Sequence, residues 1–425
     1  MTVTVFLASL LGAMALGMPI AFALIACALA LMALQGSFDT TILSQKLIEG
    51  ADSYPLLAIP FFIFAGELMN KGGMSRRIVD FALALVGHVR GGLGLVAIFA
   101  AILMAAISGS AAADAAALGT LLIPMMRKAG YDVPRSAGLI AAGSIIAPCM
   151  PPSVALIIFG VVANVSIGKL FMATIVPGLL MGVSLVIAWL WVVRKDRIEA
   201  LPRKSLREVL LVSREAVWAL VMPLAVIGGM KIGLFTPTEA AVVACAYAFL
   251  VGMFINRELK WRDIYPLLVS AAKTTSIVVF LIATALISAW LITTSAVPQQ
   301  IAAMLSPFMD SPRTLMFVMM VLVVIIGTAL DFAPTLMILT PVLMPIVKQA
   351  GIDPVYFGVL FIMNNAIGLI TPPVGIVLNV LSGVSKISMA DVVKGCWPFL
   401  IAETIVLFLL VLFPAIVLVP YRWLT

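Results

Sequence analysis

Two short stretches of small and polar residues interrupt long apolar runs in this sequence of 425 residues. The first is Ser108-Gly109-Ser110, with Asp114 close behind it, and the second contains Gly327, Thr328 and Asp331. Each predicts the tip of a re-entrant helical hairpin. Hydroxyls, carboxylates and freed backbone carbonyls are oxygen ligands that suit a hard monovalent cation.

Two proline breaks follow the tips, one in each half of the chain. They are Pro151-Pro152, just after Pro148, and Pro372-Pro373, just after Asn365. A double proline cannot continue a helix. Unpaired backbone is tolerated at membrane depth only where it is buried in protein or lines a wet cavity. A tip beside a proline break occurs twice, which predicts two cation sites with a substrate between them. The N-termini of the half-helices would face an anionic substrate. Few groups there can titrate, which favours sodium over protons.

The acidic residues in apolar surroundings have two interpretations each. Asp114 and Asp331 either tune the cation sites or cap the half-helices that follow them. Glu67 lies near a predicted helix end, where an interfacial role is the simpler interpretation, and Glu239 opens a helix and fits a cap. Lys273 and Trp290 are expected to be interface anchors.

The composition identifies the solvent around these elements. Hydrophobic residues make up 63% of the chain, only 11% are charged, and the mean hydropathy is +1.21. Soluble proteins are about one quarter charged. Lipid must therefore surround most of the chain, which excludes a cytosolic enzyme, a secreted domain and a disordered protein. The net charge of +7 lies mainly in short loops, a membrane pattern that does not indicate nucleic acid.

Other chemistry is excluded by what the sequence lacks. Its four cysteines form no CxxC motif, which argues against zinc and against a disulfide framework. His88 is the sole histidine, too little for a haem site or a histidine proton relay. There is no P-loop motif, so no ATP hydrolysis of that type is expected. We expect no cofactor and no enzymatic activity, and transport must be driven by a gradient or by a partner.

Apolar segments of spanning length recur along the chain. The segment 1–34 lacks the basic residues that begin a signal peptide, so it is predicted to be an uncleaved membrane segment. The polar loop 194–216 holds seven basic and four acidic residues and is predicted to be cytoplasmic, with both termini outside. The remaining segments lie near 54–70, 76–93, 93–107, 136–162, 170–193, 216–232, 236–255, 274–294, 314–330, 355–381 and 394–419.

An internal repeat divides the chain in two. A shift of 221 residues aligns Pro124 with Pro345, Asp132 with Asp353, and both double prolines. The halves are 1–193 and 217–425, joined by 194–216. An odd number of crossings in each half would invert one relative to the other, an architecture of transporters with a midplane site.

Each predicted half contains the same elements. Repeat 1 has scaffold helices, an interfacial arm helix within 38–58, a hairpin near 93–129 and a broken helix near 136–162. Repeat 2 has an arm near 256–272, a hairpin near 314–350 and a broken helix near 355–381. The predicted fold is an all-α polytopic membrane protein with two inverted-topology repeats.

The motifs resemble those of one family over essentially the whole chain. They are IPFFIFAGELMNKGG, SGSAAADAAALG, IPMMRKAGYD, APCMPPS, GLFTPTEAA and ITPPVG. In combination they are similar to the large membrane subunit of the tripartite ATP-independent periplasmic (TRAP) transporters. The resemblance implies an elevator mechanism in the bacterial inner membrane, and import of an organic acid such as a C4-dicarboxylate, sialic acid or keto-sugar acid with sodium. It also implies a periplasmic substrate-binding protein and a separate small four-helix membrane subunit as partners.

The resemblance also implies where sodium binds. The first cation site would use Ser108, Ser110, Gly143 and Pro148, and the second would use Gly327, Thr328, Gly368 and Thr371. The tips differ, so symmetric ligation is not expected. The substrate would lie near Gly109, Asp114, Pro151, Pro152, Asp331, Asn365, Pro372 and Pro373.

Three alternatives make different predictions. A tripartite importer requires sodium, the small subunit and the binding protein together. A stand-alone or proton-coupled carboxylate carrier of the same fold would follow a pH gradient without sodium. A membrane scaffold or enzyme subunit without transport activity would lose only stability when Ser110 or Asp331 is changed. The residues alone do not decide between a dicarboxylate and a sugar acid such as diketogulonate.

Overall fold

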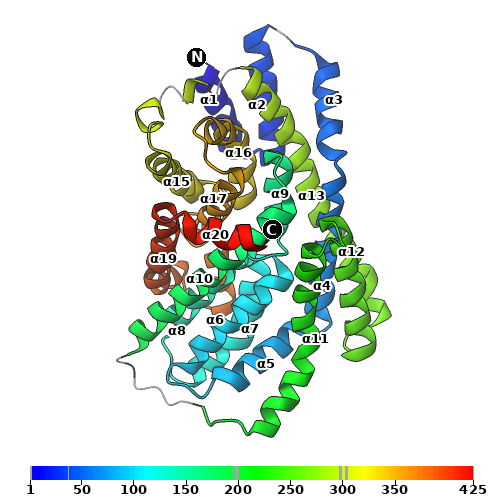
Figure 1. The fold of residues 1–425 in the computed structure, drawn as a ribbon, viewed down its shortest axis with the longest axis vertical. Helices are drawn as coiled ribbons and strands as arrows, with labels where there is room; N and C mark the ends of the chain where they lie inside the picture. Colours follow the sequence, from blue (N-terminus) through cyan, green and yellow to red (C-terminus); the bar gives the residue numbers. More distant parts are fainter. Residues whose placement is uncertain are drawn as a thin grey trace.

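The structure is a computed structural model that describes residues 2–36, 38–194, 196, 201–295, 299–301 and 305–424 (Figure 1). Every regular element among them is helical. Six of the described helices are long and apolar enough to cross a bilayer, and two bent helix pairs raise that number to eight. The all-α polytopic membrane fold is therefore confirmed. Part of the predicted loop 194–216 lies outside the described residues.

The elements follow the predicted order. In the first half they are α1 (Thr2–Ala15), α2 (Ile20–Gln35), α3 (Thr40–Ala51), η1 (Tyr54–Leu57), α4 (Ala58–Lys71), α5 (Met74–Val86), α6 (Gly92–Ser108), α7 (Ala111–Lys128), α8 (Val133–Ser144), η2 (Ala147–Cys149), α9 (Val154–Ala163) and α10 (Ile167–Val193). In the second half they are α11 (Leu206–Lys231), α12 (Pro237–Leu250), the π-turn η3 (Val251–Ile255), α13 (Trp261–Thr294), η4 (Ser306–Phe308), α15 (Pro312–Ala329), α16 (Phe332–Gln349), α17 (Pro354–Gly368), α18 (Ile376–Ser385), α19 (Met389–Leu412) and α20 (Ala415–Leu424).

Two helix pairs turn at the predicted tips. Helix α6 ends at Gly109, whose φ of 60° is in the left-handed region that favours glycine, and Ser110 caps α7. Helix α15 ends before Leu330, and Asp331 caps α16. Ser110 and Asp331 therefore occupy the same position in the two hairpins, as the shift of 221 predicts.

Two other helices are interrupted at the double prolines. Helices α8 and α9 are bent by 45° across η2 and the Pro151-Pro152 pair. Helices α17 and α18 are separated by a turn that contains Pro372-Pro373. Both Pro-Pro peptide bonds are cis. These breaks lie inside the predicted ranges 136–162 and 355–381.

The scaffold helices of the two halves are interlocked. Helix α2 packs on α13 of the other half, and α12 packs on α4 of the first half. Two ion pairs join the α4–α5 turn to the residues before and at the start of α13: Lys71 lies 3.3 Å from Asp263, and Arg77 lies 2.7 Å from Glu258.

The prediction of a separate arm helix near 256–272 is wrong, because α13 runs without a break from Trp261 to Thr294. Residues 270–277, SAAKTTSI, contain no glycine or proline that would end a helix there. The corresponding arm in the first half, α3, does end, and the helix pair is bent by 51° before α4. The segments 1–34 and 216–255 each form two helices, separated near Pro19 and Pro237.

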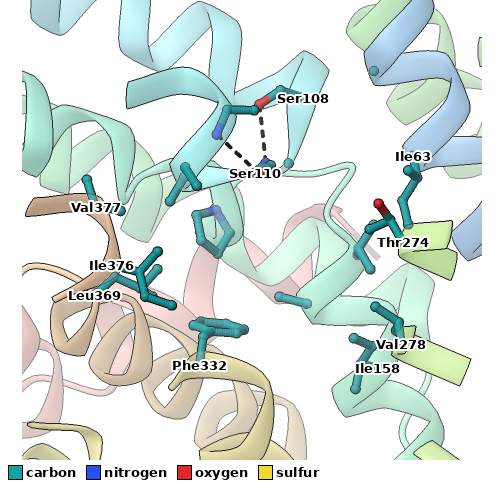
Figure 2. A pocket seen from close by; sticks show the side chains of 18 of the residues that line it. Ile63, Ser108, Ser110, Ile158, Thr274, Val278, Phe332, Leu369, Ile376 and Val377 are labelled. Atoms are coloured by element: carbon teal, nitrogen blue, oxygen red, sulfur yellow. Dashed lines mark hydrogen bonds between the residues drawn. The ribbon is translucent and has the colours of Figure 1, made fainter. Parts of the chain in front are cut away.

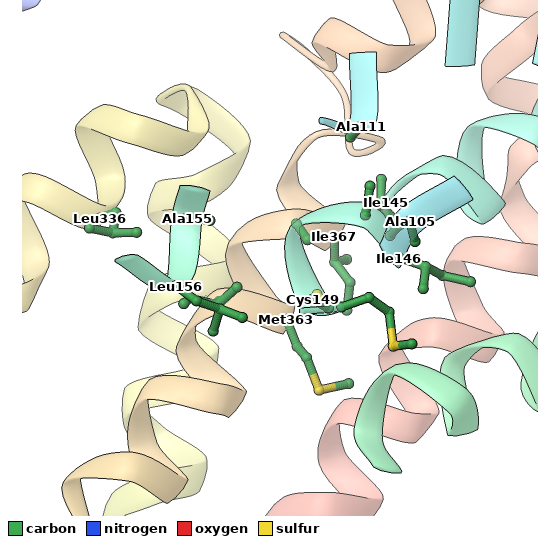
Figure 3. Close-up of a cluster of buried hydrophobic side chains, with 14 of the residues drawn as sticks. Ala105, Ala111, Ile145, Ile146, Cys149, Ala155, Leu156, Leu336, Met363 and Ile367 are labelled. Atoms are coloured by element: carbon green, nitrogen blue, oxygen red, sulfur yellow. The ribbon is translucent and has the colours of Figure 1, made fainter. Parts of the chain in front are cut away.

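The broken helices share one core with the hairpins (Figure 3). The Phe159 ring of α9 lies 5.9 Å from the Phe361 ring of α17, between centroids. Gly358 permits this approach, because a Cβ there would lie 2.3 Å from a Phe159 ring carbon. Tight packing of this kind holds the two breaks at a fixed separation.

Candidate functional site

A cavity of about 410 Å³ lies where both tips and both breaks meet (Figure 2). Elements from both halves of the chain form its wall. The lining residues are Ile63, Gly66, Glu67, Asn70, Ser108, Gly109, Ser110, Ala111, Ala112, Ala113, Pro148, Val154, Ala155, Ile158, Thr274, Val278, Asp331, Phe332, Leu369, Ile376 and Val377. A volume of this size falls in the range of small-molecule sites.

The first tip is held against the first break. A Cβ at Gly109 would lie 3.1 Å from the carbonyl oxygen of Pro152, so the two backbones are in close contact. The backbone amide of Ser110 donates to Ser108 Oγ at 3.2 Å, and Ser110 Oγ accepts from Ala113 at 3.4 Å (Figure 2). Both serines and Gly109 line the cavity, as expected for a site built on this tip.

The first break contributes Pro148 to the cavity wall. Its carbonyl oxygen accepts from Ser153 Oγ at 2.8 Å, which fixes the turn between η2 and α9. The buried Pro151-Pro152 pair lies in that turn. Of the four residues predicted for the first cation site, Gly143 lies away from the cavity wall: it faces α6, where a Cβ would lie 3.1 Å from the Ala101 Cβ.

The second tip and break meet through glycine. A Cβ at Gly368 would lie 2.9 Å from the Gly327 carbonyl oxygen, so α15 and α17 touch at their C-terminal ends. The hydroxyls of Thr328 and Thr371 donate to Ile325 and Ile367 carbonyls at 2.7 and 2.8 Å. These four predicted residues lie outside the cavity lining, which takes Leu369 and Ile376 from either side of the turn that contains Pro372-Pro373.

Asn365 stands beside this glycine contact. Its Nδ2 donates to the Phe332 carbonyl at 2.6 Å and so ties α17 to the start of α16. Its Oδ1 lies 4.0 Å from where a Gly327 Cβ would stand. This oxygen is buried and accepts no hydrogen bond from the described residues, so it is an unpaired acceptor close to the second tip.

Asp114 is completely buried. Neither carboxylate oxygen makes a hydrogen bond of standard geometry to the described residues, and the Ser108 hydroxyl is its polar neighbour. It is not the cap of α7, because Ser110 has that role. Burying an uncompensated carboxylate is costly, so a counter-charge is needed when Asp114 is ionised.

Asp331 has the role of a cap. Its Oδ1 accepts from the Phe332 backbone amide at 2.7 Å, and it also forms part of the cavity wall. The two interpretations of Asp331 are therefore compatible in this structure, whereas for Asp114 the cap interpretation is wrong.

Four helix N-termini line the cavity. The starts of α7, α9, α16 and α18 contribute Ala111, Val154, Phe332 and Ile376. The N-terminus of a helix presents free backbone N–H groups and a partial positive charge, which favours an anionic ligand. The described lining residues include Glu67 and Asp331 but no Lys, Arg or His.

The sequence prediction missed the wall supplied by the scaffold. Glu67 lies in the cavity wall, and its Oε1 accepts from Ser270 Oγ of α13 at 2.6 Å. Asn70 lines the cavity one turn further along α4, and Thr274 does so from α13. The spacing of Ile63, Glu67 and Asn70 places them on one helix face, and that stripe was the available signal.

The chain is similar to known proteins along nearly its whole length. A family model described as "Tripartite ATP-independent periplasmic transporter, DctM component" matches residues 7–416. The chain is 51% identical to the 2,3-diketo-L-gulonate TRAP transporter large permease protein of Escherichia coli, over 100% of both chains. It is 40% identical to the sialic acid large permease of Vibrio cholerae, over 95% of both, and 38% identical to the C4-dicarboxylate large permease of Pseudomonas aeruginosa, over 90% of both.

The fold also matches a solved structure. The crystal structure of the YdaH transporter of Alcanivorax borkumensis superposes with a TM-score of 0.63 over 87% of this chain and 86% of that chain. The sequence identity is 14%, so this likeness concerns the fold alone.

Proposed function

This chain belongs to the DctM component family of the tripartite ATP-independent periplasmic transporters and is a large permease subunit, and we propose from this premise that it imports an organic acid together with sodium ions. The family consists of transporter subunits, not enzymes. Membership implies a small membrane subunit and a periplasmic binding protein as partners, and we propose a small subunit of four helices. The bacterial inner membrane is the implied location.

The observation that supports an anionic substrate is the convergence of four helix N-termini on one cavity. A carboxylate placed there would accept from backbone N–H groups at the starts of α7, α9, α16 and α18. The relative at 51% identity is named for diketogulonate, and the other two for sialic acid and C4-dicarboxylates. We propose a sugar acid as the substrate. The hydroxyl groups of the sugar acid would lie near Ser108 and Ser110, and the amide of Asn70 would face its other polar groups.

The charge of the cavity supports cation coupling. Glu67 and Asp331 line it, Asp114 is buried close by, and the described lining residues supply no basic side chain to offset them. An anionic substrate would add to this negative charge, so binding needs cations. We propose sodium beside the first tip, on Ser108, Ser110, Gly143 and Pro148, and beside the second tip, on Gly327, Thr328, Gly368 and Thr371, where the free Asn365 oxygen is a further ligand.

The arrangement of elements supports elevator movement. The scaffold of α1–α4 and α11–α13 contributes one cavity wall, and the hairpins with the broken helices contribute the other. The crossed packing of α2 on α13 and of α12 on α4 is the arrangement expected of two inverted repeats. Moving the second wall against the first would carry the cavity contents across the membrane.

Uptake into proteoliposomes tests this function. Purified chain, reconstituted with the small subunit, should accumulate labelled sugar acid only with an inward sodium gradient and the loaded binding protein. Omission of each component in turn is the control. Undiminished uptake without the binding protein would contradict the tripartite assignment. Uptake that follows a pH gradient without sodium would instead support a proton-coupled carrier, with Glu67 and Asp331 as the titratable groups in the cavity.

A further inference from the structure

A second cleft, of about 630 Å³, separates the scaffold from the hairpin and broken-helix elements at another level of the molecule. Its scaffold wall comes from α3 and α13, and its opposite wall from the end of α9 and the second half of α16. Three of these helices also line the central cavity. Phe332 of α16 lies in the central cavity and Lys348 lies in the cleft, 16 residues later, which is about 24 Å along a helix.

The charge of this cleft is opposite to that of the central cavity. Two lysines line it from opposite walls: Lys46 on α3 and Lys348 on α16. Lys46 forms an ion pair with Glu49 at 2.6 Å, so its charge is already offset. Lys348 is exposed and has no ion pair among the described residues, which leaves the cleft with a net positive charge.

Hydrogen-bond donors accompany this free charge. Asn164, which ends α9 in the left-handed region at φ 53°, and Trp290 of α13 both line the cleft. Neither the Asn164 side-chain amide nor the Trp290 indole N–H donates to another described residue. An ammonium, an amide and an indole N–H line one cleft, where Lys348 and Asn164 are exposed to solvent and Trp290 is half-buried. A carboxylate could replace water as their acceptor and would also compensate the positive charge.

We propose that this cleft is an outer anion site that binds the carboxylate of the substrate on its way to the central cavity. The inference rests on the proposed transport function. The cleft lies at the C-terminal end of α9, away from the first break at Pro151-Pro152. There the chain turns into α10, which runs toward the loop 194–216. With that loop in the cytoplasm, the cleft opens to the periplasm, where the binding protein releases substrate. The positive charge raises the local concentration of an anion before it meets the negative central cavity.

The shape of the cleft would also change during elevator movement. One of its walls belongs to the scaffold, and the other belongs to the part that moves against the scaffold. Lys348 would approach or leave Lys46 as α16 moves along α13. A carboxylate held on Lys348 against the scaffold wall is favoured in one position of the moving part, so its binding at the cleft and its transfer inward are linked.

The test is steady-state uptake by the complete reconstituted system with Lys348→Gln, Lys46→Gln and Trp290→Phe. We expect Lys348→Gln to raise the half-saturating substrate concentration about five- to tenfold, with the maximal rate within about twofold of the unchanged protein. Lys348→Arg should restore the original value. Lys394→Gln, on the exposed start of α19, removes a lysine charge away from the cleft and is the control, although Lys394 lies 4.0 Å from Asp391 and Lys348 has no such partner among the described residues.

Three results would overturn the proposal. The first is a half-saturating concentration in Lys348→Gln equal to that of Lys394→Gln. The second is an effect that appears in vesicles with anionic lipid but not in vesicles of phosphatidylcholine alone, because the anion would then be a lipid headgroup. The third is a weaker affinity of the binding protein for the membrane complex of the Lys348→Gln variant, if that change alone explains the raised half-saturating substrate concentration. Each variant is compared only where its gel-filtration profile matches that of the unchanged protein.

The same experiment separates this inference from the proposed function. If the unchanged protein takes up substrate with a pH gradient instead of sodium, the proposed coupling fails, and the lysine variants still report on the cleft. If sodium-driven uptake is intact and Lys348→Gln behaves as the control does, only the cleft proposal fails.

Discussion

At the scale of single residues, the acids divide by their hydrogen bonds. Asp331 accepts a backbone hydrogen bond at the start of α16, whereas both oxygens of the buried Asp114 have no such bond among the described residues. Local composition alone does not separate them, because both acids stand at a tip of small residues, but the shift of 221 aligns Asp331 with Ser110 and not with Asp114. The difference comes from three-dimensional placement: Ser110 already caps α7 and leaves Asp114 one turn inside the helix.

Asp114→Asn should weaken sodium coupling. The neutral amide removes the charge that a bound cation would offset, so the sodium concentration for half-maximal uptake should rise about tenfold or more. Because burial of an ionised group is also relieved, thermal stability without sodium should not fall. Sodium titration of uptake and a melting curve measure both. Unchanged sodium dependence would remove Asp114 from the cation site.

Asp331→Ala should destabilise the second tip, while Asp331→Asn should not. Asparagine is as good an N-cap as aspartate, but alanine loses the hydrogen bond and about 1 kcal/mol. Thermal unfolding in detergent compares the two variants. If asparagine proves as damaging to stability as alanine, the carboxylate charge has a structural role beyond capping.

At the scale of elements, the helix breaks could be predicted well because their cause is local. Proline pairs and glycines in positive-φ geometry interrupt helices locally, so both hairpins and both broken helices lie at their predicted positions, with ends no more than four residues outside the predicted ranges. The continuity of α13 could not be predicted from local signals. Its amphipathic stretch and its spanning stretch join without a residue that marks the junction. The scaffold wall of the cavity was missed because Glu67 and Thr274 meet only when the two halves pack.

Gly109→Ala tests the contact between the first tip and the first break. Left-handed geometry costs about 1–2 kcal/mol for alanine, and the new Cβ would lie 3.1 Å from the Pro152 carbonyl oxygen. We expect uptake to fall at least tenfold, because the tip must shift from the break.

Gly130→Ala is the matched control for this change. Gly130 has a φ of 80° and nothing within 4 Å of its Cβ position, so alanine there introduces the same backbone strain without the contact. Equal loss of uptake in the two variants would show that strain alone is responsible and that the tip contact has no functional part.

At the scale of the whole molecule, the orientation in the membrane follows from charge. The loop 194–216 carries an excess of basic residues and is proposed to be cytoplasmic. In a background without the four native cysteines, Lys204→Cys should react with a membrane-impermeant maleimide in inverted vesicles but not in intact spheroplasts. Phe38→Cys, before α3, should give the opposite pattern. Labelling of Lys204→Cys in intact spheroplasts would reverse the proposed orientation and move the outer cleft to the cytoplasmic side.

The unequal long helices of the scaffold have a consequence for the resting state. If the two halves had identical shape and inverted orientation, a two-fold axis in the membrane plane would relate the outward and inward positions of the moving part, and their free energies would be equal. Here α13 is continuous over 34 residues, while its counterpart, the α3–α4 pair, is bent by 51°. The moving part therefore packs against scaffold surfaces of different shape in its two positions. We therefore expect unequal populations of the outward and inward positions. Without substrate, most molecules should have the cavity open to the same side of the membrane.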